Sequence, residues 1–121
     1  MTVPNESVAN DPLSQEDPFY WVDVRGHHHC LVHKMFDPAG QGPCGWWAGG
    51  HLFSVDGTKW SPISRAYNVT IVTVDGAATN LTRRERPKLI YNAGGAPTHL
   101  FNGMISGDGK QVYTGVAPLN V

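Results

Sequence analysis

The chain has 121 residues, and its nine Lys and Arg residues nearly balance its ten Asp and Glu residues, for a formal net charge of −1. That balance shows no sign of the basic surface that binds nucleic acid or anionic membranes, so neither partner is expected. No apolar run approaches the roughly 18 residues that a membrane span needs. Fourteen glycines and nine prolines indicate one domain, or part of one, built from short strands and turns.

The first 15 residues are polar, contain two prolines and lack the basic and apolar regions of a signal peptide, so we expect a loop or frayed tail. Turn-forming residues separate the later apolar stretches, and apolar residues rarely recur at helical spacing. We therefore predict an all-β fold. The expected strands, in chain order, are a hairpin over about 17–36 and then strands at 46–54, 59–60, 68–74, 83–91, 98–102 and 111–116.

The sequence contains an internal echo at a separation of 69 residues. Both copies read Glu, any residue, Pro, an apolar strand, Asp or Asn, a turn glycine, and then a strand with a histidine. The matched pairs are Glu16 and Glu85, Pro18 and Pro87, Asp23 and Asn92, and Gly26 and Gly95. His29 and His99 fall one residue out of step, which predicts a slip in the returning strand. Repeat units of this kind bury their faces against neighbours, so two copies alone would leave one sheet face uncovered.

The phrases EDPFYWVDVRG-HHH, GGHLFSVDGTKW and RRERPKLIYNAGGAPTHLFNG resemble the later blades of five-bladed β-propeller glycosidases similar to glycoside hydrolase family 43. Residues 54–60 fit the family's blade turn, Ser-x-Asp-Gly-x-x-Trp. The resemblance implies antiparallel propeller blades: a tail at 1–15, then a partial propeller at 16–121 with blade-like units at about 16–82 and 83–121. A complete propeller needs roughly 300 residues, so this chain would supply about two of five blades, from the C-terminal side.

The resemblance makes Glu16, in Glu16-Asp17-Pro18, the candidate general acid. Glycoside hydrolysis usually needs two carboxyl groups, one acting as acid and the other as base or nucleophile. The inner end of a blade strand would face Glu16 into the propeller channel, and Pro18 would fix the backbone there. A solvated carboxylate at a loop end is the alternative. Asp17 could face the channel or cap the strand, because alternation would point it away from Glu16.

Further residues are expected to bind substrate. Glu85 occupies the second Glu-x-Pro, where flanking arginines, Arg84 among them, suit ligand binding or a structural ion pair more than acid catalysis. Histidines could hydrogen-bond sugar hydroxyls, and a tryptophan beside glycines could stack on a sugar ring; core packing is the alternative for both. The candidate substrate-binding residues are Asp17, His33, Trp47, His51, Arg84 and Glu85.

Neither a cofactor nor a metal is expected. His27, His29 and His33 share one strand parity, but alternate strand residues advance by about 6.6 Å and so spread too far for one ion. Pairing of Cys30 with Cys44 stays open beside two free thiols. Localisation stays unknown, with a lean toward secretion from three N-x-[ST] tripeptides and two cysteines.

Three functional hypotheses follow. The first is a glycoside hydrolase-like protein or fragment with a carbohydrate substrate and Glu16 as its acid. The second is a non-catalytic carbohydrate-binding propeller module. The third is a small β-domain that self-associates, or that needs missing N-terminal blades, to complete a ring. Whether this chain is enzymatically active alone is left open by its sequence.

Overall fold

The computed structural model describes residues 15–34 and 48–119, and all regular structure within them is β-strand. The nine strands are β1 (Gln15–Val22), β2 (His28–Lys34), β3 (Gly49–Ser54), β4 (Ser64–Tyr67), β5 (Thr70–Val72), β6 (Ala78–Asn80), β7 (Arg83–Tyr91), β8 (Pro97–Ile105) and β9 (Val112–Pro118). The all-β prediction is confirmed. Within these residues there is no helix, and hence none that could cross a membrane.

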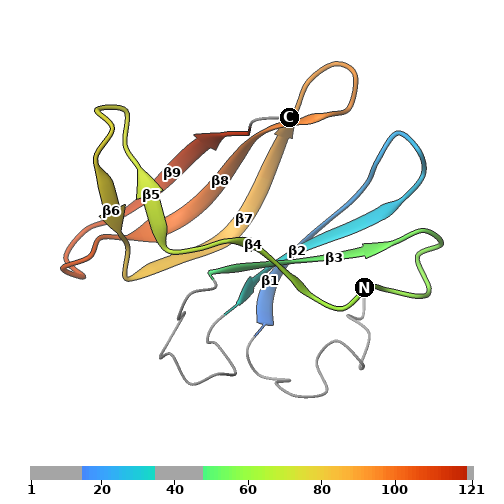
Figure 1. Ribbon diagram of the computed structural model, residues 1–121, viewed down its shortest axis with the longest axis horizontal. Helices are drawn as coiled ribbons and strands as arrows, with labels where there is room; N and C mark the ends of the chain where they lie inside the picture. Colours follow the sequence, from blue (N-terminus) through green and yellow to red (C-terminus); the bar gives the residue numbers. More distant parts are fainter. Residues whose placement is uncertain (1–14, 35–47, 120–121) are drawn as a thin grey trace.

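Every strand pairing is antiparallel, and the strands form three open sheets (Figure 1). The first sheet has the order β1-β2-β3-β4, the second is the hairpin β5-β6, and the third has the order β7-β8-β9. In each sheet, strands that are consecutive in sequence are also neighbours in space, so each sheet is a simple meander. The described strands close no sheet on itself.

Two strand expectations were wrong. The predicted strand at 59–60 is part of a longer turn, because Asp56 Oδ1 accepts hydrogen bonds from the backbone N–H groups of Thr58 and Lys59 at 2.8 and 2.9 Å. The predicted run 68–74 is shorter and belongs to the hairpin β5-β6. Thr73 N donates to the carbonyl of Ala77, which reverses the chain there. Strands β4 and β6 were not expected at all.

The sequence echo has a close structural counterpart. Strands β1 and β7 each carry a bulge immediately after the repeated glutamate, between residues 16 and 19 and between 85 and 88. The turns that follow are alike, with Gly26 and Gly95 at φ of 82° and 83°. Glycine suits both places, because side chains disfavour positive φ. The predicted slip is confirmed: Trp21 pairs with His29 and Ile90 with His99.

The first and third sheets meet through β7, which contacts β1, β2 and β3 (Figure 1). Leu31, Ala48, Tyr67 and Leu100 form the shared core, with Phe19 and Leu89 among the partly buried residues around it. A second core of Cys30, Val32 and Leu52 lies on the other face of the first sheet. Cys30 is a free thiol there, and burial raises its pKa to about 11. Cys44 lies outside the described residues.

Candidate functional site

The two bulges share an unusual backbone conformation. Asp17 and Arg86, the middle residues of the two Glu-x-Pro segments, both have φ of 53°, in the left-handed region. A bulge inserts an extra residue and re-aims the side chains beside it. The bulge in β1 lies between Glu16 and Phe19 and contains Asp17, so the regular alternation of strand side chains does not apply there.

The bulges bring both repeated glutamates to one place. His33 Nδ1 donates a hydrogen bond to Glu16 Oε1 at 3.0 Å and lies 3.9 Å from Glu85 Oε2. Arg83 Nη2 lies 3.0 Å from Glu85 Oε2 and 3.8 Å from Glu16 Oε1. We call these four residues the Glu16–Glu85 cluster. Two carboxylates thus share one imidazole and one guanidinium, from strands β1, β2 and β7.

The four side chains of the Glu16–Glu85 cluster differ in their exposure to solvent. The His33 side chain is fully buried at 0%, and the Glu85 side chain is 17% exposed. Those of Glu16 and Arg83 are 41% and 42% exposed. The buried imidazole therefore forms the floor of the site and orients Glu16. Glu16 and Arg83 are the two side chains that a ligand reaches first.

The spacing limits the chemistry of this pair. Ligand atoms of Glu16, His33 and Glu85 all lie within 4.8 Å of one another, close enough to share a cation. The Arg83 guanidinium already places a positive charge against both carboxylates. The two carboxylates are closer than the about 6.5–9.5 Å that inverting glycosidases leave for a water between their carboxyl groups. The 4.8 Å limit is also slightly shorter than the about 5–5.5 Å between the carboxyl groups of retaining enzymes, and both carboxylates share His33 and Arg83.

A second polar cluster lies at the far end of β1 and contains Asp23, His29 and His51. His29 Nε2 donates to Asp23 Oδ2 at 3.1 Å, and its Nδ1 lies 3.0 Å from His51 Nε2. Trp21 stacks on His29 with ring centroids 4.7 Å apart. Burial and the neighbouring His29 lower the pKa of His51. Despite some desolvation, hydrogen bonds from Arg25 and His29 hold the pKa of Asp23 well below its usual range.

The structure separates the predicted site residues. Glu16, His33 and Glu85 come together, whereas His51 belongs to the second cluster. Arg84 is buried on the opposite face of β7 from Glu85, where its Nε donates to Asn102 Oδ1 at 3.0 Å. Asp17 is partly buried at its bulge. Trp47 lies outside the described residues.

Sequence reasoning missed Arg83, which pairs with both carboxylates. A signal for it was present, because residues two apart on a strand project from the same face, and Arg83 is two positions before Glu85. The flanking Arg84, which was predicted instead, projects from the other face.

No protein-family model matches this chain, and neither a curated protein nor a solved structure does. The resemblance to propeller glycosidases therefore depends on the sequence phrases alone. It stays a prediction, and the functional argument has to be made from the geometry of the site.

Proposed function

We propose that this chain is a glycoside hydrolase-like, carbohydrate-binding module in which the first and third sheets are successive blades of a partial five-bladed propeller. The Glu16–Glu85 cluster is its sugar-binding centre, and Glu16 is the candidate general acid. The observation that carries the proposal is that two repeated Glu-x-Pro bulges, 69 residues apart, converge on one buried histidine.

The packing of the sheets supports the propeller part of the proposal. Strands β1 and β7 begin the two repeated units and lie against each other. The units pack in a head-to-tail sense, because the face of the first sheet that carries Phe19 and Leu31 packs on the face of the third sheet that carries Leu89 and Leu100. The strand registers make Phe101 of the third sheet, and not Leu100, the residue equivalent to Leu31 of the first sheet. The face of the third sheet that carries Leu100 is therefore not the equivalent of the first-sheet face on which it packs. Successive propeller blades also pack through non-equivalent faces.

The polar groups suit sugar hydroxyls. Carboxylate oxygens of Glu16 and Glu85 accept hydrogen bonds, while the Arg83 guanidinium donates them, so neighbouring hydroxyls find both kinds of partner. Ionised groups make hydrogen bonds about twice as strong as neutral ones. His33 holds Glu16 toward the opening of the site. Because Glu85 shares His33 and Arg83 with Glu16, we expect the carboxylate that faces Glu16 across the scissile bond to come from elsewhere.

Binding of neutral oligosaccharides to the full chain tests the proposal. Titration calorimetry with arabinose, xylose and galactose oligomers is compared for the unaltered chain, Glu16→Gln and Glu85→Gln. Losing a charged hydrogen-bond partner should weaken binding about tenfold in each variant. Asp108→Asn, in a turn distant from the cluster, should leave the affinity unchanged. Hydrolysis, followed by release of reducing ends, should disappear in Glu16→Gln wherever the unaltered chain shows it.

The outcomes separate the two parts of the proposal. Binding that depends on Glu16 without turnover identifies a binding module. If no oligosaccharide binds the unaltered chain, or if Glu16→Gln binds as tightly as the unaltered chain, the Glu16–Glu85 cluster is not a sugar site.

A further inference from the structure

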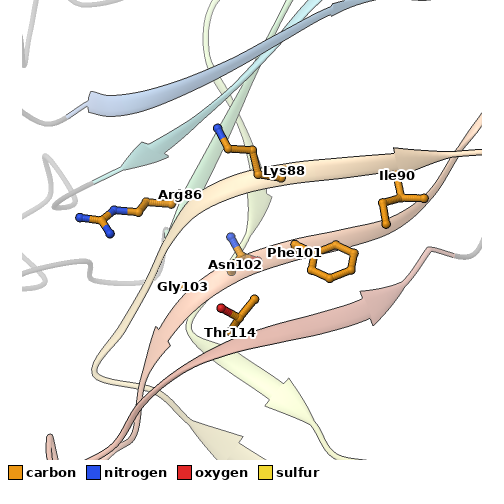
Figure 2. A pocket seen from close by; sticks show the side chains of 7 residues that line it. All are labelled: Arg86, Lys88, Ile90, Phe101, Asn102, Gly103 and Thr114. Carbon is orange, nitrogen blue, oxygen red and sulfur yellow. The ribbon is translucent and has the colours of Figure 1, made fainter.

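A groove of about 430 Å³ opens on the third sheet (Figure 2). Its lining comes from all three strands of that sheet: Arg86, Lys88, Ile90, Phe101, Asn102, Gly103 and Thr114. Strand alternation places Lys88 and Phe101 on the face opposite Leu89 and Leu100, which pack toward the first sheet. The groove therefore opens on the face opposite Leu89 and Leu100, and at its edge Lys88 reaches the Phe19 ring of the first sheet.

The groove is cationic although the whole chain has a formal net charge of −1. Arg86 and Lys88 are both exposed, and no carboxylate is among the lining residues. Within the described residues Arg86 has no ion pair, while Lys88 Nζ lies 5.4 Å from the centroid of the Phe19 ring. A guanidinium matches the two oxygens of a carboxylate with two parallel hydrogen bonds. On β8, Phe101 pairs with Lys88 and Gly103 pairs with Thr114, so the Phe101 ring offers an apolar surface beside Lys88.

The two copies of the repeat differ at this groove. The strand registers match Lys88 with Phe19 and Gly103 with His33, and the bulges match Arg86 with Asp17. The ring of Phe19 is thus replaced by the ammonium group of Lys88, and the carboxylate of Asp17 by the guanidinium of Arg86. At the position of the His33 imidazole, the second copy has Gly103, which has no side chain.

This difference decides which occupant suits the groove. If another sheet packed over this groove, Arg86 and Lys88 would leave water without an ion-pair partner among the described residues, and Lys88 would keep only the Phe19 ring. Burying two cations in this way is strongly unfavourable. A soluble ligand that carries its own negative charge avoids that cost. The ring of Phe101 and the hydroxyl of Thr114 add partners for a sugar ring.

The groove adjoins the Glu16–Glu85 cluster. Glu85 pairs with Gly103 across β7 and β8, and Glu85 Cγ lies 3.8 Å from the position that a Cβ on Gly103 would take. Arg86 directly follows Glu85. An oligosaccharide bound at the cluster can therefore extend into the groove without crossing a strand.

We propose that the groove is a subsite for a uronic acid residue, so that the preferred ligand is an acidic oligosaccharide. The sugar carboxylate pairs with Arg86 and Lys88, its ring lies on Phe101, and the next sugar residue occupies the Glu16–Glu85 cluster. This inference depends on the proposed function, because it names the substrate class of the same site.

The test compares ligands that differ only in the carboxylate. Trigalacturonate and a glucuronate-substituted xylotriose are each titrated into the full chain beside their carboxyl-reduced, neutral counterparts. We expect each acid to bind about tenfold more tightly than its neutral counterpart at low salt, and this preference to shrink as NaCl is raised. Arg86→Asn and Lys88→Gln should each remove most of the preference, lowering the affinity for the acids far more than that for their neutral counterparts. Asn tolerates the left-handed backbone of residue 86.

Lys110→Gln, in the exposed turn between β8 and β9, removes one positive charge outside the groove and is the matched control. If it lowers the affinity for the acids as much as Arg86→Asn does, the attraction is non-specific and the subsite is refuted. If neutral and acidic ligands bind equally, the subsite is refuted while the proposed function stands. If no ligand of either kind binds, the proposed function fails and the subsite with it. If the chain self-associates and neither acid binds to the self-associated form, the inference is likewise refuted.

Discussion

Asn102 links the core of the third sheet to the bulge that positions Glu85. Its side chain is 1% exposed; Oδ1 accepts from Arg84 Nε at 3.0 Å and Nδ2 donates to the carbonyl of Glu85 at 3.2 Å. Arg84 is also buried, with Nη1 donating to the carbonyl of Asn68 and its guanidinium 4.7 Å from the Tyr67 ring centroid. Burial lowers the pKa of Arg84, although Tyr67 opposes this, so the charged group depends on its remaining partners.

We expect Asn102→Leu to lower the free energy of unfolding by about 3 kcal/mol. The hydrogen bond from the charged Arg84 contributes about 1.5–3 kcal/mol, and leaving the partly buried carbonyl of Glu85 without the Asn102 donor adds about 1 kcal/mol. For a domain of this size the loss corresponds to a fall in melting temperature of roughly 10 °C. Urea unfolding followed by tryptophan fluorescence measures the free energy, and circular dichroism follows the melt.

Two comparisons make this prediction specific. Asn80→Leu removes an exposed asparagine that accepts a hydrogen bond from Thr70, and it should cost less than about 1 kcal/mol. Combining Arg84→Met with Asn102→Leu removes both partners, so the double variant should be more stable than the sum of the single losses predicts, by about 1 kcal/mol or more. Strictly additive losses, or a loss below about 1 kcal/mol for Asn102→Leu alone, would refute the reasoning.

Three further predictions concern single side chains. Burial and the neighbouring His29 lower the pKa of His51, so the unfolded chain binds a proton at His51 more readily than the folded chain does. The contribution of neutral His51 to stability is therefore complete above about pH 6.5 and declines as the pH falls below that value. Melting temperatures between pH 7.5 and 5 should therefore fall less steeply in His51→Gln, and equal slopes would contradict this. Arg86→Gly should raise the stability by roughly 0.5–1 kcal/mol in urea unfolding, because it relieves a left-handed backbone, whereas Arg65→Gly in β4 should lower it. Asp23→Asn should lower the melting temperature at neutral pH. Because the pKa of Asp23 is depressed, the difference between the variant and the unaltered chain should vanish only as the pH falls well below 4. If the difference persists in strong acid, the charge of Asp23 is not its cause.

Local sequence patterns predicted much of the fold. The turn at 23–26 and its copy at 92–95 follow from Asp or Asn, whose side chain accepts backbone N–H groups, and from a glycine at positive φ. The aromatic stretch at 19–21 marked β1, and shorter apolar stretches before or after turn signals marked β7 and β8. Strand β4 escaped prediction because it is short and three of its four residues are exposed, so no alternating apolar pattern marks it.

For the candidate site too, the sequence predicted the local features and not the contacts between distant segments. Each Glu-x-Pro segment, and its repetition, could be recognised from the residues alone. That Glu16 and Glu85 share His33 and Arg83 could not, because the contact joins residues that are far apart in the chain and depends on β7 packing beside β1 and β2.

The amino-acid sequence by itself determined the strand-rich character of this protein, its turns and its two-fold echo, since each depends on conformational preferences within a few residues. Only the tertiary structure decided which copy of the repeat provides a buried imidazole and which leaves an open cationic groove. That distinction depends on which sheet face is covered by another sheet, and burial is a property of the packed molecule, since no local pattern specifies it.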